Sequence, residues 1–371
     1  MILTKTDLVA LIAKLQNVIA SKPAMPILAN ILLEAVDDQL IVSGTDLTVS
    51  MRCFMNANVL EEGAIALPAR RFFQLVRELG PSEIKITAHT TEVAEIASGS
   101  SLFKIHGMGK AEFPQLPSFA GAPEVQFTSS QLREMLSKTV FAAAREDNRY
   151  TLNGVQLQIS NRTATFIGTD GKRLAKAVSE VVADASVSGS YVIPIKAAEE
   201  MIHMLDEKND AKATLMLSAD RIALEAGQAT LMSKLLAGQF PDVERIIPKE
   251  ASYQISIHRE ELSTLLRQVS LFTSQTSHSV RFAFAPGELS LSATSSEIGE
   301  GSVSMPVDFS GDRFEIAFNP FYLLDILRHS RDEVIRIGLK DPHNPALITD
   351  SSQVQFVLMP MRLSEPVTTT V

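Results

Sequence analysis

Apolar residues recur every three or four positions in six separate segments of the chain, a spacing typical of amphipathic helices. Short apolar runs bounded by turn-forming residues lie between these segments and predict strands. Thr128-x-x-Gln131, just before the third helical segment, has the pattern of a capping box. The predicted helices span residues 7–22, 69–79, 130–145, 196–208, 259–272 and 320–331.

The same order of elements occurs three times, and one short motif marks each copy. The motifs are Gly44-Thr45-Asp46, Gly168-Thr169-Asp170 and, in weaker form, Ala293-Thr294-Ser295. Their spacings of 124 and 125 residues indicate tandem copies of a whole domain. Consecutive short strands without helices between them favour antiparallel sheets, so we predict an α+β fold with two helices per domain. Three similar domains in one chain suggest an arc, or part of a ring, that surrounds something.

Proline-containing segments mark the predicted domain boundaries. A Phe-Pro step recurs in two copies, at Phe113-Pro114 and Phe240-Pro241, and linkers follow near 117–123 and 248–252. The predicted domains are therefore 1–120, 121–250 and 251–363. The remaining polar tail, 364–371, is expected to be disordered.

The composition is that of a soluble globular protein, with 45% hydrophobic residues. Lys5, Asp7 and Lys14 interrupt the apolar residues at the start of the chain, so we expect neither a signal peptide nor a membrane span. The single cysteine, Cys53, cannot form an internal disulfide and is interpreted as a small core residue. These features indicate a cytoplasmic protein.

Residues that commonly carry enzyme chemistry form no convincing motif. The seven histidines lack metal-ligand spacing, and Gly107-Met108-Gly109 lacks the third glycine of a dinucleotide loop. Asp46 and Asp170 hold equivalent positions in two repeats, where each is expected to cap its own turn. We therefore expect no catalytic residue, no cofactor and no metal. An alternative is an enzyme site on the loop that carries Asp170, Lys172 and Arg173, but the sequence offers no obvious further residue to complete an acid–base cluster there.

The distribution of charge matters more than the net charge of −9, which alone argues against nucleic-acid binding. The six predicted helices contain 14 Lys and Arg against 10 Asp and Glu, so they carry +4 while the rest of the chain carries −13. If the helices share one surface, that surface attracts phosphates without reading bases. Ordinary solvated helix faces are the alternative interpretation.

Five segments carry a family resemblance that covers residues 1–363. They are Lys22-Pro23-Ala24-Met25-Pro26-Ile27-Leu28, Arg149-Tyr150-Thr151-Leu152-Asn153-Gly154, Gly168-Thr169-Asp170-Gly171-Lys172-Arg173-Leu174-Ala175, Phe240-Pro241-Asp242 and Met359-Pro360-Met361-Arg362-Leu363. In this order, on a threefold repeat, they resemble bacterial DNA polymerase III beta subunits, the sliding clamps.

The resemblance implies a non-catalytic processivity factor. Two chains would join head to tail in a ring of six domains, with helices lining a central hole and antiparallel sheets outside. This homodimer would encircle duplex DNA, slide without sequence specificity and tether the replicative polymerase. The clamp loader and other proteins with short clamp-binding peptides are further expected partners. A repeated protein-binding scaffold with no DNA role is the competing hypothesis. The basic residues expected to face DNA are Lys22, Arg70, Arg71, Arg77, Arg133, Lys138, Lys196, Arg267 and Arg328.

The resemblance also implies a partner-peptide pocket between the second and third domains. Flexible methionines would suit an adaptable apolar cleft, and arginines on its rim would hold carbonyl or acidic groups of the peptide. From the pattern alone, the apolar members could equally be core residues of their sheets. The pocket residues are Arg149, Leu152, Thr169, Gly171, Lys172, Arg173, Leu174, Pro241, Arg245, Ile246, Asn319, Tyr322, Val357, Leu358, Met359, Pro360, Met361 and Arg362.

Ring closure would bring an edge of the first domain of one chain to an edge of the third domain of the other. Apolar residues would pack at this joint, and acidic residues would face basic groups across it. The residues expected at the dimer interface are Phe103, Ile105, Leu271, Phe272, Glu297 and Glu300.

Overall fold

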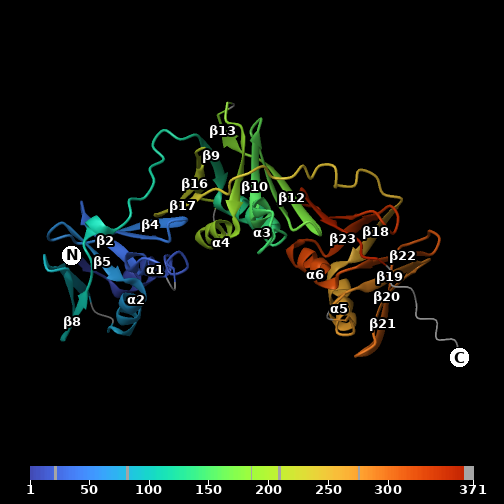
Figure 1. Cartoon of the computed structure of the whole chain (residues 1–371), viewed down its shortest axis with the longest axis horizontal. Helices are drawn as coiled ribbons and strands as arrows, with labels where there is room; N and C mark the ends of the chain where they lie inside the picture. The colour runs from blue at the N-terminus through green and yellow to red at the C-terminus, as the bar shows by residue number, and fades with distance from the viewer. Residues whose placement is uncertain (21–22, 81–82, 185, 208–209, 275, 363–371) are drawn as a thin grey trace. The chain divides into compact units, whose positions relative to one another are not determined.

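The computed structural model describes residues 1–20, 23–80, 83–184, 186–207, 210–274 and 276–362 (Figure 1). These residues form six α-helices and 25 β-strands, joined by short 3-10 helices and turns. The chain divides into two compact units. The first comprises residues 1–134, 160–162 and 181–237, and the second comprises residues 135–159, 163–180 and 238 onward.

The first unit contains a nine-stranded antiparallel sheet and a four-stranded one. The larger sheet has the order β13-β9-β15-β16-β17-β4-β3-β2-β5, and the smaller one β1-β6-β7-β8. The strands of these two sheets are β1 (Ile2–Leu3), β2 (Asn30–Val36), β3 (Gln39–Thr45), β4 (Val49–Asn56), β5 (Gly63–Pro68), β6 (Ile84–Ala88), β7 (Val93–Ser98), β8 (Ser101–His106), β9 (Glu124–Thr128), β13 (Val182–Ala183), β15 (Lys212–Leu217), β16 (Arg221–Ala226) and β17 (Ala229–Lys234). The strand β14 (Gly189–Pro194) also lies in the residue range of this unit but belongs to neither sheet. The helices of this unit are α1 (Lys5–Ala13), α2 (Ala69–Glu78) and α4 (Ile195–Met204), and α1 packs against α2 (Figure 1).

The second unit also contains two antiparallel sheets. One has the strand order β10-β11-β12-β25-β24-β23-β18, and the other β21-β20-β19-β22. The strands are β10 (Gly154–Ser160), β11 (Thr163–Thr169), β12 (Arg173–Glu180), β18 (Tyr253–His258), β19 (Val280–Ala285), β20 (Glu288–Ser295), β21 (Gly299–Pro306), β22 (Phe314–Phe318), β23 (Val334–Leu339), β24 (Ala346–Thr349) and β25 (Val354–Leu358). The helices α5 (Arg259–Ser270) and α6 (Pro320–His329) pack against each other, and α3 (Ser129–Val140) contains residues of both units.

Three-stranded meanders are the repeated element of both units. Within the chain they join through their third strands: β4 of β2-β3-β4 pairs with β17 of β15-β16-β17, with Met51 opposite Leu231. By the same rule, β12 of β10-β11-β12 pairs with β25 of β23-β24-β25, with Leu174 opposite Val357. Two meanders remain, β6-β7-β8 and β19-β20-β21, and their third strands β8 and β21 are sheet edges.

The repeated Gly-Thr-Asp motif ends the middle strand of its meander, and its aspartate caps the following turn, as predicted. Asp46 Oδ1 accepts hydrogen bonds from the Thr48 and Val49 amides at 2.8 and 2.7 Å. Asp170 Oδ1 likewise accepts two amides, at 2.9 and 3.0 Å. The motif glycine is needed for close packing, because a Cβ at Gly168 would lie 2.1 Å from the carbonyl oxygen of Thr139 in α3.

The helices begin close to their predicted starts, but three end earlier than predicted: the first at Ala13, the third at Val140 and the fourth at Met204. The capping box is confirmed, since the Thr128 amide donates to Gln131 Oε1 at 3.3 Å and the Gln131 amide donates to Thr128 Oγ1 at 3.2 Å. The first helix, predicted to reach residue 22, ends at Ala13. The chain continues in turns because the Leu15 and Val18 amides bond to carbonyls three residues back. Both side chains are still buried, which explains why the apolar spacing persists beyond the helix.

Cys53 is fully buried in β4, as predicted for a core residue. Burial raises the pKa of its thiol to about 11, so the reactive thiolate is suppressed at neutral pH. Phe113, from the first Phe-Pro step, packs with Ile27 and Leu28 in a small core cluster. In the part of the chain that the structure describes, no helix is both long enough and apolar enough to cross a bilayer.

Candidate functional sites

Part of the predicted partner-peptide set lies on the β12–β25 ladder of the second unit. Arg173 and Leu174, which open β12, lie opposite Leu358 and Val357 near the end of β25. The ladder is antiparallel, so the start of one strand meets the end of the other. Residues nearly two hundred positions apart in the sequence therefore become neighbours.

Backbone hydrogen bonds extend this grouping to the start of α6. The Met359 amide donates to the Lys172 carbonyl at 2.9 Å, and the Met361 amide donates to the Ala317 carbonyl at 2.7 Å. Ala317 lies in β22, two residues before Asn319, whose side chain caps α6 by accepting the Phe321 amide at 2.9 Å. The segment after β25 thus links the β12 side of the site to the helix that carries Tyr322.

Burial divides the predicted apolar residues into two groups. Ile246 and Met359 expose 43% and 37% of their surfaces, so a partner can reach them directly. Four leucine and valine side chains of the set are buried instead, and for them the core interpretation of the sequence holds. The buried members of the predicted set are Leu152, Thr169, Leu174, Val357 and Leu358.

Arg173 is bonded within the protein, and its side chain is only 11% exposed. Its Nε donates to Asp170 Oδ2 at 3.1 Å, and its Nη1 donates to Asp325 Oδ2 at 2.6 Å. The guanidinium carbon lies 4.7 Å from the ring centroid of Tyr322 and 5.4 Å from that of Phe141. Two carboxylates and two aromatic rings therefore surround the Arg173 guanidinium, which the sequence analysis predicted to lie on the rim of the peptide pocket.

Arg149 and Arg245 fit the predicted rim position better, because both are exposed. Arg149 is held by Asp147, with Nε–Oδ1 and Nη2–Oδ2 distances of 2.9 and 2.8 Å, and it lowers the pKa of Asp147 to about 2. Its guanidinium lies over Gly171, whose φ of 83° favours glycine. The Arg245 side chain reaches Asp242 at 3.2 Å and is 88% exposed.

Three residues absent from the predicted set complete this cluster: Phe141, Asp325 and His329. The rings of Phe141 and His329 stack at 4.1 Å with an interplanar angle of 5°. His329 Nδ1 donates to the Asp325 carbonyl at 2.8 Å. Burial lowers the pKa of His329. The positive charges of Arg328 and Arg173 also lower it, whereas Asp325 raises it. The one detectable signal was spacing, since Tyr322, Asp325 and His329 recur at i, i+3 and i+7 on α6.

Helix α2 exposes three of the arginines that the sequence analysis assigned to DNA contact. Phe72 and Val76 are buried, while Arg70, Arg71 and Arg77 are exposed on the opposite side. The first turn of α2 contains no acidic residue, so no carboxylate of that turn competes for Arg70 or Arg71. These arginines can therefore approach a polyanion.

The other predicted DNA-facing residues differ in their surroundings. Arg267 and Arg328 are exposed on α5 and α6. Lys196 Nζ contacts Asp46 Oδ2 at 2.5 Å, and Arg133 Nη1 donates to the carbonyls of Ile202 and, at 3.3 Å, Leu205.

Lys138 is a correction to the prediction. It is 6% exposed, because it lies on the buried side of α3, so its ammonium cannot face DNA in this structure. Lys22 lies outside the described residues.

The predicted dimer residues lie at or beside the two free edges, with one correction. On β8, Leu102 and Phe103 are exposed, but Ile105 is 8% exposed and contributes to the core of its own sheet. The prediction therefore assigned Ile105 wrongly and missed Leu102, which is 57% exposed. Beside β21, Leu271 is exposed, and the ring of Phe272 covers Gly301 so closely that a Cβ there would lie 2.5 Å away. Glu297 and Glu300 are exposed near the start of β21.

Comparison with known proteins agrees with this geometry along the whole chain. Models of the DNA polymerase III beta subunit match in order: the N-terminal domain at residues 1–117, the central domain at 126–242 and the C-terminal domain at 244–362. The chain belongs to the DNA polymerase III beta subunit family. Its function is that of a DNA polymerase processivity factor in replication, a non-catalytic role, and its three domains have the α+β clamp fold.

Two kinds of relative illustrate the similarity. The beta sliding clamp of Chlamydia muridarum is 49% identical over 364 residues, which cover 98% of this chain and 99% of that protein. The Pseudomonas aeruginosa sliding clamp bound to griselimycin superposes with a TM-score of 0.94 at 28% identity, covering 98% of this chain and 99% of that one. A C. crescentus clamp with polyethylene glycol at a proposed beta-motif tethering region gives a TM-score of 0.91 at 28% identity, with the same coverage.

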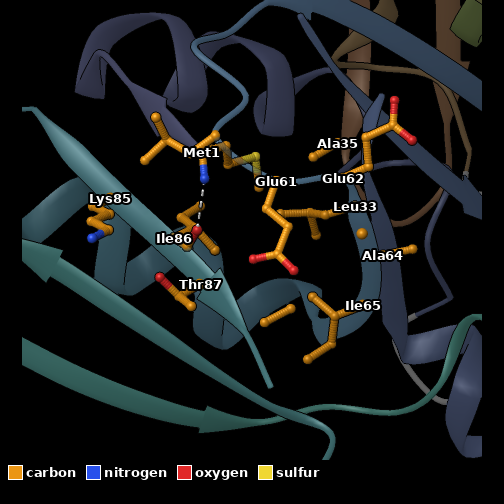
Figure 2. A pocket seen from close by; sticks show the side chains of 13 residues that line it. Met1, Leu33, Ala35, Glu61, Glu62, Ala64, Ile65, Lys85, Ile86 and Thr87 are labelled. Carbon is orange, nitrogen blue, oxygen red and sulfur yellow. Dashed lines mark hydrogen bonds between the residues drawn. The ribbon is translucent and has the colours of Figure 1, made fainter. Parts of the chain in front are cut away.

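The first unit of this beta subunit also has a cavity of about 240 Å³ where β5 meets β6 (Figure 2). The Met1 ammonium donates to the Ile86 carbonyl at 3.1 Å, and burial and Lys85 lower its pKa. Glu61 and Glu62 line the same space. Among the residues that the structure describes, none of those predicted for the DNA, dimer or partner sites lines this cavity.

Proposed function

We propose that two copies of the chain close into a ring by pairing β8 of each copy with β21 of the other. The rule of strand pairing inside the chain carries this proposal. Two of the joints between meanders are made by third strands, β4 with β17 and β12 with β25. Only β8 and β21 remain as the third strands of meanders without such a partner among the described strands. In a head-to-tail ring of two copies, the β8 edge of each copy would pair with the β21 edge of the other, which gives two such joints.

The side chains at these edges support the same joint. Leu102 and Phe103 on β8, and Leu271 beside β21, are exposed apolar groups on strands or loops at free edges. Exposed edges with apolar side chains invite pairing, and a closed dimer would remove them from water. Glu297 and Glu300 would then lie near the incoming edge.

The ring would encircle duplex DNA, with the helices facing it. Arg70, Arg71 and Arg77 on α2, together with Arg267 and Arg328, would supply phosphate contacts without base recognition. Lys196 and Arg133 would contribute weakly, because carboxylate and carbonyl partners already hold them. A closed ring would stay on DNA because it encloses the duplex, so tight binding is not required. A few cations would therefore suffice, and sliding would not be impeded.

The β12–α6 site would bind short peptides of partner proteins, which we infer to include the replicative polymerase, the clamp loader and other clamp-binding proteins in the cytoplasm. Ile246 and Met359 would contact apolar side chains of the peptide, and Arg149 and Arg245 would contact its acidic or carbonyl groups. The buried leucines and valine would form a firm floor. A protein-only scaffold would share this pocket but would not need the ring.

The decisive experiment combines mass in solution with retention on DNA. Sedimentation velocity should give about twice 40.4 kDa. With clamp loader and ATP, the protein should stay on nicked circular DNA and leave it after one linearising cut. A protein that remains bound after the cut, or never loads, would show that binding is not topological.

Matched substitutions test the edges themselves. Leu271→Asp places a charge beside β21 and should give a folded monomer that no longer stays on circles. Val334→Asp changes another exposed apolar residue, 48% exposed against 72% for Leu271, on β23, which pairs on both sides, and should remain dimeric. If both variants stay dimeric, the β8–β21 joint is wrong.

A further inference from the structure

We propose that Asp325 and Phe141 are positioning residues for the partner-peptide pocket, because they fix Arg173 as a bridge between β12 and α6. The bridge sets the distance between the two walls of the pocket before a peptide arrives. This inference rests on the proposed peptide-binding function. It assigns to two residues outside the predicted site the task of keeping that site in its binding geometry.

The first argument is the coordination of Arg173. A guanidinium has five N–H donors in a rigid plane, and its two faces can stack on aromatic rings. Here Asp170 and Asp325 take donors on two of its nitrogens, while Tyr322 and Phe141 approach its carbon at 4.7 and 5.4 Å. At 11% exposure, this arginine has little room to turn toward a ligand.

The second argument is where its partners lie in the chain. Asp170 belongs to the turn just before β12, so its bond to Arg173 is local. Asp325 is 152 residues away on α6, one helical turn beyond Tyr322. The 2.6 Å contact therefore ties α6 to β12 and holds the face of α6 that carries Tyr322, one of the predicted pocket residues.

Phe141 also holds the Arg173 bridge, through contacts of its ring. It follows the last residue of α3 and stacks on His329, which lies on α6 at i+4 from Asp325. Its ring centroid is also 6.0 Å from that of Phe356 in β25, the strand that leads to Met359. One ring thus contacts side chains from β12, β25 and α6, the three elements that frame the pocket.

A consequence for recognition follows from the charges. Two carboxylates, Asp170 and Asp325, face Arg173, and Arg328 lies 3.7 Å from the other oxygen of Asp325, so the negative and positive charges of this set balance. A peptide carboxylate gains little by approaching this set, whereas Arg149 and Arg245 are exposed and a ligand can replace the carboxylate that holds each of them. Arg173 therefore shapes the pocket, and the two exposed arginines contact the ligand.

The test measures peptide binding and wall rigidity in the intact full-length protein. The binding probe is a fluorescein-labelled peptide from the clamp-binding segment of the same organism's replicative polymerase. For rigidity, Tyr322→Trp introduces the sole tryptophan of a chain that has none, and its anisotropy without peptide reports the mobility of that wall. The variants are Asp325→Asn, Asp325→Glu, Phe141→Leu and Arg173→Gln. The control is Glu260→Gln, which breaks a comparably short ion pair with Arg259 on α5.

We expect Asp325→Asn to weaken probe binding about fivefold, as is typical of coupled neighbouring residues. Phe141→Leu should act in the same direction without changing any charge, and Asp325→Glu should restore most of the affinity. Adding Asp325→Asn to Arg173→Gln should cause little further loss. In the Tyr322→Trp background, Asp325→Asn should lower the anisotropy of the peptide-free protein, and Glu260→Gln should change neither readout.

Two failures are distinguishable. If the wild type does not bind the probe, or Met359→Ala binds it normally, the peptide-site assignment itself fails and the inference fails with it. If the wild type binds and Met359→Ala does not, but Asp325→Asn and Phe141→Leu bind like the wild type, the pocket stands and only the positioning role is refuted. An equal loss in Glu260→Gln would mean that the effect is one of general stability, which also refutes it.

Discussion

Replacing Arg133 by methionine separates two roles that the sequence could not distinguish, DNA contact and helix capping. Arg133 donates to the carbonyls of Ile202 and Leu205, where α4 ends. The last carbonyls of a helix lack partners within it, and a cation there also meets the negative end of the helix dipole. Methionine keeps the apolar stem of the arginine and removes only the guanidinium.

The expected cost follows from these contacts. A hydrogen bond to a charged group contributes about 1.5–3 kcal/mol when well formed. One of the two bonds is long, at 3.3 Å, and the side chain is only half-buried, so we take about 2 kcal/mol for both together. For a unit of this size, such a loss lowers Tm by about 4–8 °C.

Urea unfolding followed by circular dichroism measures the stability, and the salt dependence of duplex binding measures phosphate contacts. Arg133→Met should lower the urea midpoint and leave the salt slope nearly unchanged. Arg71→Met, on the exposed side of α2, should do the reverse: stability within about 0.5 kcal/mol and a salt slope smaller by about one phosphate contact. If Arg133→Met keeps wild-type stability and reduces the salt slope instead, the capping role is refuted and the original DNA assignment is correct.

Three further predictions follow from burial. Leu102→Asp on β8 should give monomers by sedimentation velocity, as Leu271→Asp should from the other edge, and a dimeric Leu102→Asp variant would contradict the edge assignment. His329 has a lowered pKa in the folded protein, so the folded state binds fewer protons than the unfolded chain. The contribution of neutral His329 to stability is therefore lost as pH falls below the ordinary value of 6.5. The thermal unfolding temperatures of wild type and His329→Gln, measured between pH 7.5 and 5, should converge at the acidic end. Cys53, with a thiol pKa of about 11, should react with a disulfide reagent at pH 8 only after urea is added, and rapid reaction of the native protein would contradict its burial.

Much of the fold is predictable because its signals are local. Amphipathic spacing depends on which side of an element faces a core, so six helices can be placed from it. The capping box at Thr128 and the turn-capping aspartates Asp46 and Asp170 are also local, since donor and acceptor lie within three residues. The first helix shows the limit: Leu15 and Val18 keep the apolar spacing in turns, where burial continues without helical hydrogen bonds.

Side-chain environments are less predictable because they depend on which distant elements meet. Lys138 and Ile105 have the chemistry expected of surface and interface residues, but each faces its own core. Arg173 could not be distinguished from an exposed rim arginine, since its carboxylate on α6 is 152 residues away. Phe141 has no local signal at all, because its role comes from three elements that converge on one ring.

The joints between meanders also differ in the concentration at which their strands meet. β4 and β17 lie on one chain, as do β12 and β25, so each strand experiences its partner at an effective concentration on the order of millimolar. β8 and β21 of different copies would meet only at the concentration of the protein in the cell. Dilution would therefore open the proposed ring at these two edges while every sheet inside each chain stays intact, and a duplex could enter through one open joint without any domain unfolding.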